Sequence, residues 1–363
     1  AREAGGDCCM TWMIYGAYGS TGRLITALAA ERGEMPLLAG RDERRLANLA
    51  EMFELDHRTF DLSDQKASRD ALWGVQTVAL CAGPFSATSR PMVDACLSAG
   101  TNYLDITGEI DVFEDVLARA EQARRAGVSL LPGAGFDVVP SDCLASLLAR
   151  AHPGATSLSL AIRMTGGASP GTAKTMVESL GNHGRARVGG TIGPVPSGRR
   201  RRRVPFRDGE SDALAIAWGD VSTAYHSTGI GDVTVYAALP RAFAPLSGVL
   251  NVSGPVLRSF TVKSVLRRVA GRVPGPSAQT RSTSGGELWG EARSEDGVRA
   301  TGSITTPNGY DLTADAVVRI AAGMSTGRVA PGAWTPSGAL GADFVRELDK
   351  VVVHEVCTQL PGL

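Results

Sequence analysis

Three glycines spaced three residues apart, Gly16, Gly19 and Gly22, follow a short apolar run near the start of the sequence. Gly16 can adopt the positive φ of a tight turn, and Gly19 lets a phosphate approach the backbone because it has no Cβ. Gly22 allows the following helix to pack closely on the strand. The free N–H groups at the start of that helix form an anion site. This spacing predicts a loop around the pyrophosphate of a dinucleotide, with hydroxyl donors from Ser20 and Thr21.

An arginine follows the next apolar strand, expected at residues 36–39, where NAD-selective proteins carry Asp or Glu. The guanidinium of Arg41 can pair with a 2′-phosphate through two hydrogen bonds and can stack on adenine. The next residue, Asp42, is a favoured N-cap, so we expect it to cap a helix rather than bind ribose. The sequence therefore favours NADP over NAD, with Arg44 and Arg45 as further cations.

Apolar runs alternate with helical periods through the first part of the chain. Strands are expected at 12–15, 36–39, 57–60, 77–80, 102–105 and 128–131, with helices that include 91–98 and 113–125. This alternation predicts an α/β fold, a Rossmann doubly wound parallel sheet. Its ligands bind beyond the carboxyl ends of the strands. Two further binding candidates follow strands: Asp61 for an adenine edge, and Ala82, Gly83 and Pro84 for the nicotinamide ribose.

The pattern changes after about residue 141. Residues 156–164 alternate like a half-buried strand, and further strands are expected at 233–236, 287–292 and 298–305, the last two joined by the hairpin signal Asp296-Gly297. A second α+β domain on a mostly antiparallel sheet is implied. We therefore expect four regions: 1–9, an upstream extension or cloning remnant; 10–142, the dinucleotide-binding domain; 143–330, the substrate and dimerisation domain; and 331–363, a C-terminal segment returning to the core.

Composition limits the function classes. The 37 basic and 37 acidic residues give a formal net charge of zero, which argues against a dedicated nucleic-acid binder. Six cysteines form no metal pattern, so we expect no metal site and interpret them as reduced cytoplasmic thiols, with Cys81 as a packing residue. No secretory signal and no uninterrupted apolar run long enough to span a bilayer are evident.

Two segments leave alternatives open. Residues 241–273 are largely apolar, with Arg and Lys residues interspersed. We expect helices that cover the active site or form a dimer interface, and the alternative is an acyl-chain groove or a membrane-surface helix. The basic run Arg199–Arg203 is interpreted as a solvated loop or hairpin arm. The alternative is a contact with an anionic substrate, an acyl carrier protein or a CoA tail.

Three blocks at the expected strand ends, 81–85, 99–109 and 133–142, resemble successive signatures of the saccharopine dehydrogenase-like family. Within that family the chain is most similar to the bacterial trans-acting enoyl reductases. Later blocks also fit: 171–178, 225–229, 275–277 and 335–343. The resemblance implies a nicotinamide-dependent oxidoreductase that binds a small-molecule or carrier-bound substrate, with a homodimer left open.

The resemblance implies an NADPH-dependent reductase acting on a C=C or C=N bond, with an enoyl group of lipid, polyketide or other secondary metabolism as the leading interpretation. An imine or amino-acid reductase of the saccharopine type and a non-catalytic dinucleotide-binding partner protein are the alternatives. The expected cofactor residues are Gly16, Tyr18, Gly19, Ser20, Thr21, Gly22, Arg41, Asp61, Ala82, Gly83, Pro84, Gly108, Glu109, Gly135, Phe136 and Asp137.

Hydride transfer to such a bond also requires one proton. Candidate donors are Glu109, Asp137 and Ser141 in the strand-end loops, and Lys174, Tyr225 and His226 in the second domain. We expect the catalytic group to be Tyr225, His226 and Lys174, with the adjacent Tyr225 and His226 as the donor pair. Glu109 is expected to hold backbone. Asp137 and Asp142 are expected to cap the helix after Pro140.

Overall fold

The computed structural model describes residues 12–164, 184–195, 201–238 and 278–360. These residues form two compact units. Unit 1 comprises the described parts of residues 1–106, with 115–134 and 314–334. Unit 2 comprises residues 107–114 and the described parts of 135–313 and 335–363. The units are interleaved in sequence, so residues 314–334, most of which we expected in the second domain, belong to unit 1.

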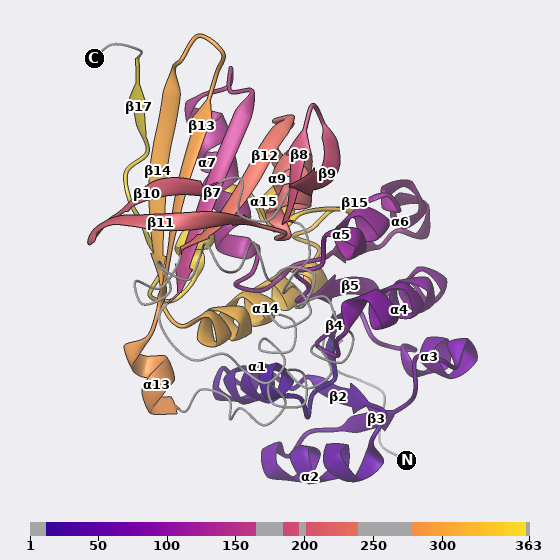
Figure 1. The fold of residues 1–363 in the computed structure, drawn as a ribbon. Helices are drawn as coiled ribbons and strands as arrows, with labels where there is room; N and C mark the ends of the chain where they lie inside the picture. The colour runs from indigo at the N-terminus through magenta and orange to yellow at the C-terminus, as the bar shows by residue number, and fades with distance from the viewer. Residues whose placement is uncertain (1–11, 165–183, 196–200, 239–277, 361–363) are drawn as a thin grey trace, which may run out of the picture. The chain divides into compact units, whose positions relative to one another are not determined.

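Unit 1 is built on a seven-stranded sheet in which all strand pairs are parallel (Figure 1). Its strands are β1 (Trp12–Tyr15), β2 (Leu37–Gly40), β3 (His57–Thr59), β4 (Thr77–Leu80), β5 (Asn102–Asp105), β6 (Ser129–Leu131) and β15 (Gly332–Ala333). Its helices are α1 (Ser20–Glu31), α2 (Glu43–Phe53), α3 (Gln65–Ala71), α4 (Phe85–Ala99) and α6 (Ala120–Ala126). Two helices have residues in both units: α5 (Ile110–Leu117) and α14 (Gly309–Ser325).

The strand order in unit 1 is β15-β6-β5-β4-β1-β2-β3. The order reverses between β1 and β4, which makes this the switch point where doubly wound sheets bind ligands. All residues of β1, β2 and β4 are buried. This explains their continuous apolar sequences, because strands in parallel sheets are covered on both faces. The predicted Rossmann fold is confirmed.

Two expected helices differ from the observed ones. Helix α4 begins at Phe85 and contains Pro91, which we had expected near its start. The stretch 113–125 forms two helices, because α5 ends at Leu117 and α6 begins at Ala120. Arg119 lies between them and forms ion pairs with Asp94 and Asp115. Local apolar periodicity does not reveal such a break.

Unit 2 contains a ten-stranded sheet in which only β7 and β12 pair in parallel. The predicted mostly antiparallel sheet is therefore confirmed. Its strands are β7 (Ser157–Met164), β8 (Gly184–Val188), β9 (Thr191–Val195), β10 (Arg201–Phe206), β11 (Gly209–Ile216), β12 (Asp232–Ala238), β13 (Gly286–Arg293), β14 (Arg299–Thr306), β16 (Val352–Val353) and β17 (Cys357–Gln359). The helices are α7 (Val139–Ala151), α9 (Asp220–Thr228), α13 (Ala278–Thr283), α15 (Pro336–Leu340) and the 3-10 helix η2 (Ala342–Glu347).

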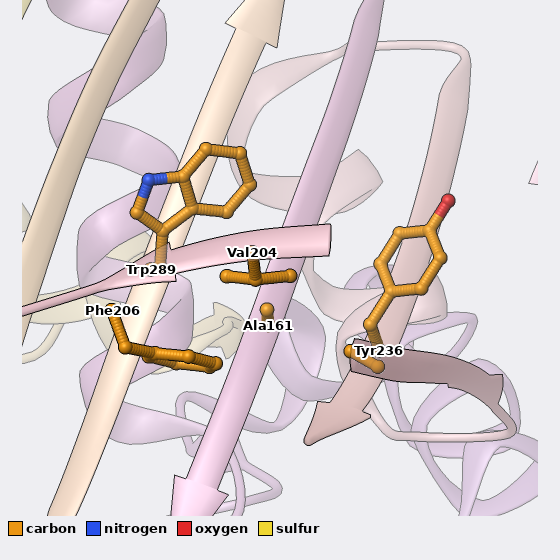
Figure 2. Packing of buried hydrophobic residues seen from close by; sticks show 6 residues of the cluster. Ala161, Val204, Phe206, Tyr236 and Trp289 are labelled. Carbon is orange, nitrogen blue, oxygen red and sulfur yellow. The ribbon is translucent and has the colours of Figure 1, made fainter. Parts of the chain in front are cut away.

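Helix α7 packs closely on one face of this sheet. A Cβ at Gly290 would lie 2.5 Å from Leu148 Cδ1, and Gly302 faces Gly290 across the β13–β14 pair. Trp289 precedes Gly290 in the strand and therefore points to the opposite face. There it joins a buried cluster with Val204 of β10, which Figure 2 shows beside Ala161 and Tyr236. The β10–β11 hairpin covers this second face.

The prediction that Asp137 and Asp142 cap α7 is wrong. This helix begins at Val139, and Val138 is an N-cap without a side-chain hydrogen bond. Asp142 instead accepts hydrogen bonds from the Ser227 hydroxyl and the Ser337 backbone N–H, the latter at 2.7 Å. Tertiary hydrogen bonds within unit 2 therefore engage the Asp142 side chain, although its local capping propensity favours the start of the helix. The Asp42 cap is confirmed, since its side chain accepts from Arg45 N at 3.1 Å.

Several expectations lie outside the described residues. They concern Lys174, Arg199, Arg200, the block 171–178, the segment 241–273 and the block 275–277. The rest of the basic run lies in β10. There Arg202 bonds Glu291 at 2.7 Å and lies over the Trp289 ring, and Arg203 lies 3.4 Å from Glu210. These contacts fit the hairpin interpretation of the run.

Candidate functional site

The glycine loop between β1 and α1 is tightly folded. Gly16 has a φ of +86°, and its N–H donates to Ala39 O at 2.8 Å. A Cβ at Gly22 would lie 2.4 Å from Gly16 O and 2.8 Å from Ala17 O. Both are backbone atoms, so a side chain at residue 22 would force the loop to change shape. Gly22 is therefore required by helix–loop packing, as its sequence position predicts.

The start of α1 is available to an anion. Gly19 is the N-cap and offers no side-chain hydrogen bond, and the first helical bond runs from Arg23 N to Gly19 O at 3.0 Å. The N–H groups of Ser20, Thr21 and Gly22 precede that bond, so the helix itself does not use them. With the helix dipole they form the type of site that binds a pyrophosphate.

Tyr18 lies between two other parts of unit 1. A Cβ at Gly40, the last residue of β2, would lie 2.7 Å from Tyr18 Cε1, and the Arg45 guanidinium lies 4.5 Å from the ring centroid. Arg45 and Arg23 also donate to Tyr18 O, at 3.5 and 3.2 Å. The end of β2, the start of α2 and the glycine loop thus meet around one aromatic ring.

Arg41 is exposed immediately after β2 and acts electrostatically on Asp61. The Asp61 carboxylate accepts from Ser63 N and Ser63 Oγ, at 2.9 and 2.8 Å. These hydrogen bonds, and to a lesser extent Arg41, lower the pKa of Asp61. Asp61 therefore lies near the arginine proposed for the 2′-phosphate. Its contact with adenine stays a prediction.

The end of β4 lies against the glycine loop, as the strand order requires. A Cβ at Gly16 would be 2.9 Å from Ala82 N. Thr88 of α4 donates to Ala82 O at 2.6 Å and fixes this turn. Burial, with a smaller contribution from Asp105, raises the pKa of the Cys81 thiol to about 12. Cys81 is thus a neutral thiol, which favours the packing role over a nucleophilic one.

The remaining cofactor candidates belong to unit 2. A Cβ at Gly108 would lie 3.0 Å from Asp137 Oδ2, so the Asp137 carboxyl rests on the glycine backbone. Phe136 donates its N–H to Thr313 Oγ1 at 3.0 Å and packs against Gly286 and Gly309. The structure brings Gly108 and Asp137 together. The cofactor roles of Gly108, Glu109, Gly135, Phe136 and Asp137 stay predictions.

The expected donor pair lies on α9, where the rings of Tyr225 and His226 meet edge to face with centroids 5.7 Å apart. Their neighbours were not found from the sequence. The Arg187 guanidinium lies 4.2 Å from the Tyr225 ring centroid, and Glu114 Oε1 lies 3.5 Å from His226 Nε2. Arg187 and Glu114 bond each other at 2.6 Å. No motif marks these two residues, because they come together only through the packing of β8 and α5.

Glu114 is the centre of this polar cluster. It also accepts from Ser222 Oγ at 2.5 Å. The hydrogen bond from His226, together with Ser222 and Arg187, lowers the pKa of Glu114 to about 2. Arg187 further donates to Val221 O and Gly190 O, at 3.0 and 2.8 Å. The cluster therefore holds a permanent carboxylate and a fixed guanidinium beside the Tyr225–His226 pair.

The described part of the chain contains no group of three or more His, Cys, Asp or Glu side chains arranged to hold a metal ion. None of its helices is both long enough and apolar enough to cross a membrane.

The fold and the glycine loop define unit 1 as a dinucleotide-binding domain of the Rossmann type. Residues 12–131 match the family model described as the saccharopine dehydrogenase NADP binding domain. The matched residues contain strands β1 to β6 of unit 1.

Relatives with assigned names extend the comparison. A Mycobacterium tuberculosis protein, provisionally named a trans-acting enoyl reductase, is 30% identical over 214 residues, 53% of this chain and 48% of that protein. A trans-acting enoyl reductase of Mycobacterium leprae is 32% identical over 138 residues, 36% of this chain and 33% of that protein. The chain thus spans half or less of the length of these relatives.

The fold resembles that of a solved structure over almost the whole chain. The apo saccharopine dehydrogenase (L-Glu forming) of Saccharomyces cerevisiae aligns with 96% of this chain and all of its own, with a TM-score of 0.63 and 12% identity. At this identity the likeness shows the fold alone. It confirms the two-part α/β architecture.

Proposed function

We propose that this protein is an NADP-dependent reductase that transfers hydride from NADPH to a C=C or C=N bond of a small or carrier-bound metabolite. The observation that carries the proposal is the glycine loop, in which Gly22 leaves no room for a Cβ, inside a domain that matches an NADP-binding family. Bound NADPH would supply the hydride, and the protein residues would bind, orient and protonate.

Unit 1 is proposed to hold the cofactor. The N–H groups at the start of α1 would bind the pyrophosphate, with hydroxyl donors from Ser20 and Thr21. Arg41 would pair with the 2′-phosphate, because an exposed guanidinium at the end of β2 suits bidentate phosphate binding. The turn Ala82, Gly83 and Pro84 would accept the nicotinamide ribose, since it already contacts the glycine loop.

Unit 2 is proposed to supply the proton. Tyr225 and His226 are half-buried and exposed, respectively, so both are accessible to a substrate. Glu114 would hold His226 in one orientation, and Arg187 would hold the Tyr225 ring. Fixed orientation is what a proton donor requires, because transfer depends on the geometry of the bound substrate.

The bond reduced is proposed to be the C=C bond of an enoyl group, because the named relatives are enoyl reductases. The competing substrate is an imine of the saccharopine-reductase type, which the match to a saccharopine dehydrogenase NADP binding domain supports. We propose a cytoplasmic location, where NADPH and the free thiols of Cys81, Cys96 and Cys143 would both be maintained.

Oxidation of NADPH, followed by its absorbance, tests this function. The acceptors are a crotonyl thioester of N-acetylcysteamine and a cyclic imine carboxylate, each also tested with NADH. We expect NADPH oxidation with the enoyl thioester and little with the imine. The matched control is the Gly22→Val variant, which should not turn over. Tight NADPH binding without turnover on either acceptor would support a non-catalytic dinucleotide-binding protein instead.

A further inference from the structure

The first turn of α2 sends charged side chains toward both neighbours of β2, which lies between β1 and β3 in the sheet of unit 1 (Figure 1). Arg45 reaches the β1 side, where its guanidinium lies 4.5 Å from the centroid of the Tyr18 ring. Glu43 reaches the β3 side, where its carboxylate accepts hydrogen bonds from Thr59 Oγ1 and from His57 Nε2, the latter at 3.0 Å. Residues two apart on a helix differ by about 200° around its axis, which explains the opposite directions.

The register of β3 places both donors on one carboxylate. Thr59 pairs with Gly40, the last residue of β2, and His57 lies two residues earlier in the strand. Residues two apart in a strand point to the same face, so both side chains can meet Glu43. These hydrogen bonds, the one from Thr59 first, lower the pKa of Glu43. Glu43 is thus an exposed carboxylate that is held at both of its oxygens.

The other two acidic side chains near the end of β2 are also engaged. Asp42 caps α2 by accepting from Arg45 N at 3.1 Å. Asp61 accepts from the backbone N–H and the hydroxyl of Ser63, at 2.9 and 2.8 Å. Each carboxylate in this region therefore has a hydrogen-bond donor other than Arg41. The exposed guanidinium of Arg41 is not required to neutralise any of them.

A carboxylate in this region matters for cofactor choice. An acid after the second strand is the feature by which dinucleotide-binding domains select NAD, because it accepts hydrogen bonds from the ribose hydroxyls. Glu43 is exposed and lies only two residues beyond Arg41. If its carboxylate rotated freely, it would repel a 2′-phosphate or pair with the Arg41 guanidinium. Either event would oppose the binding of NADP.

We propose that Thr59 and His57 act in cofactor choice by holding the Glu43 carboxylate against β3, away from the 2′-phosphate of NADP. Arg41 and Arg45 then stay available to that phosphate. Thr59 and His57 are positioning residues, because they act through Glu43 and not on the cofactor. This role rests on the proposed function, in which Arg41 pairs with the 2′-phosphate. NADH lacks this phosphate, so its binding should not depend on the restraint.

Titration calorimetry of the full chain with NADPH and with NADH tests the restraint. Thr59→Val keeps the shape of the side chain and removes the hydroxyl, whereas Thr59→Ser keeps the hydroxyl and is the matched control. Glu43→Gln removes the charge without shortening the side chain. The Thr59→Val, Glu43→Gln double variant shows whether any loss in Thr59→Val is caused by the Glu43 charge.

Thr59→Val should weaken NADPH binding about threefold, as expected for one interaction between exposed charges, and should leave NADH binding unchanged. Thr59→Ser should bind both cofactors like wild type. Glu43→Gln alone should change NADPH binding little, because the charge is already held away from the phosphate. The double variant should regain the wild-type affinity for NADPH.

His57→Leu removes the second donor and decides the question if Thr59→Val does not fold. It should also weaken NADPH selectively, and Glu43→Gln should again restore the affinity. Both selective losses should largely disappear in about 1 M salt, because interactions between exposed charges are screened there. A loss caused by altered packing would not depend on salt in this way.

Wild-type NADPH affinity in both Thr59→Val and His57→Leu would overturn the proposal. Equal losses of NADPH and NADH, or a loss that Glu43→Gln does not reverse, would overturn it too, since either would indicate a purely structural role. A gain of about threefold in NADPH affinity from Glu43→Gln alone would show that the carboxylate is not restrained.

The binding measurements separate this proposal from the proposed function, because they require no turnover. A selective loss of NADPH in Thr59→Val, with no acceptor reduced, would refute the reductase and support the restraint. Reduction of the enoyl thioester, with an unchanged NADPH preference in both variants, would refute only the restraint. Absence of NADPH binding by the wild-type protein would overturn both.

Discussion

The guanidinium of Arg45 lies 4.5 Å from the ring centroid of Tyr18, and the same ring occupies the space above Gly40. Residue 40 ends β2, where the adenosine end of a dinucleotide binds in this class of fold. The Tyr18 ring therefore holds a second cation, the Arg45 guanidinium, close to Arg41. Two guanidiniums near one position favour an anionic group such as the 2′-phosphate of NADP.

The stacking predicts how cofactor choice depends on Tyr18. Arg45→Met should weaken NADPH binding about tenfold, since one charged contact is lost, and should leave NADH almost unchanged. Tyr18→Leu should have a similar effect, whereas Tyr18→Phe keeps the ring and should not. Titration calorimetry with both cofactors measures these differences. The Tyr18→Leu, Arg45→Met double variant is the control. If its loss in NADPH binding free energy equals the sum of the two single losses, Tyr18 does not position Arg45.

Gly22→Ala should abolish tight NADPH binding. The added Cβ would lie within 2.8 Å of three backbone atoms of the glycine loop, and the backbone must move to accept it. We expect a loss of about a hundredfold in affinity and a destabilisation of about 2 kcal/mol. Gly154→Ala, whose Cβ would have 3.6 Å to its nearest neighbour, is the matched control. Ordinary NADPH binding by Gly22→Ala would show that this loop does not form the site.

Substitutions of the donor pair on α9 should lower kcat without changing the affinity for the cofactor. Tyr225→Phe or His226→Gln should lower kcat by roughly 10²-fold if the altered residue transfers the proton, with an unchanged Kd for NADPH. Glu114→Gln should have a smaller effect, because it only loosens His226. Tyr236→Phe, in the core cluster of unit 2, is the control and should be fully active. Stopped-flow turnover with the accepted substrate measures these rates, and wild-type rates in both donor variants would exclude the pair.

The raised pKa of Asp137 predicts a pH-dependent stability. The folded state holds this proton up to about pH 6, whereas the unfolded carboxyl has the ordinary value of 3.8. The favourable contribution is therefore complete below pH 3.8 and is lost as pH rises through 6. The loss is on the order of 3 kcal/mol. Relative to wild type, Asp137→Asn should gain in thermal midpoint between pH 4 and 7, and a constant difference would contradict the assignment.

The fold of unit 1 could be predicted because local signals and global structure agree there. The strands β1, β2 and β4 are continuous apolar runs, and the glycine loop, Asp42 and the strand-end turns all have local sequence signatures. The hairpin turn at Gly297, with a φ of +90°, was predictable for the same reason.

The candidate site in unit 2 could be predicted only in part. The adjacent Tyr225 and His226 are visible in the sequence, but Glu114 and Arg187 reach them from α5 and β8, more than 30 residues away. The predicted capping role of Asp142 is wrong, because its carboxylate accepts tertiary hydrogen bonds from Ser227 and Ser337 instead.

Titration calorimetry of wild type and Arg41→Ala with NADPH and NADH tests the central claim most directly. We predict that wild type binds NADPH at least tenfold more tightly than NADH, and that Arg41→Ala removes this preference while leaving NADH binding almost unchanged. Equal affinity of the wild-type protein for the two cofactors, or equal losses of both in Arg41→Ala, would contradict it.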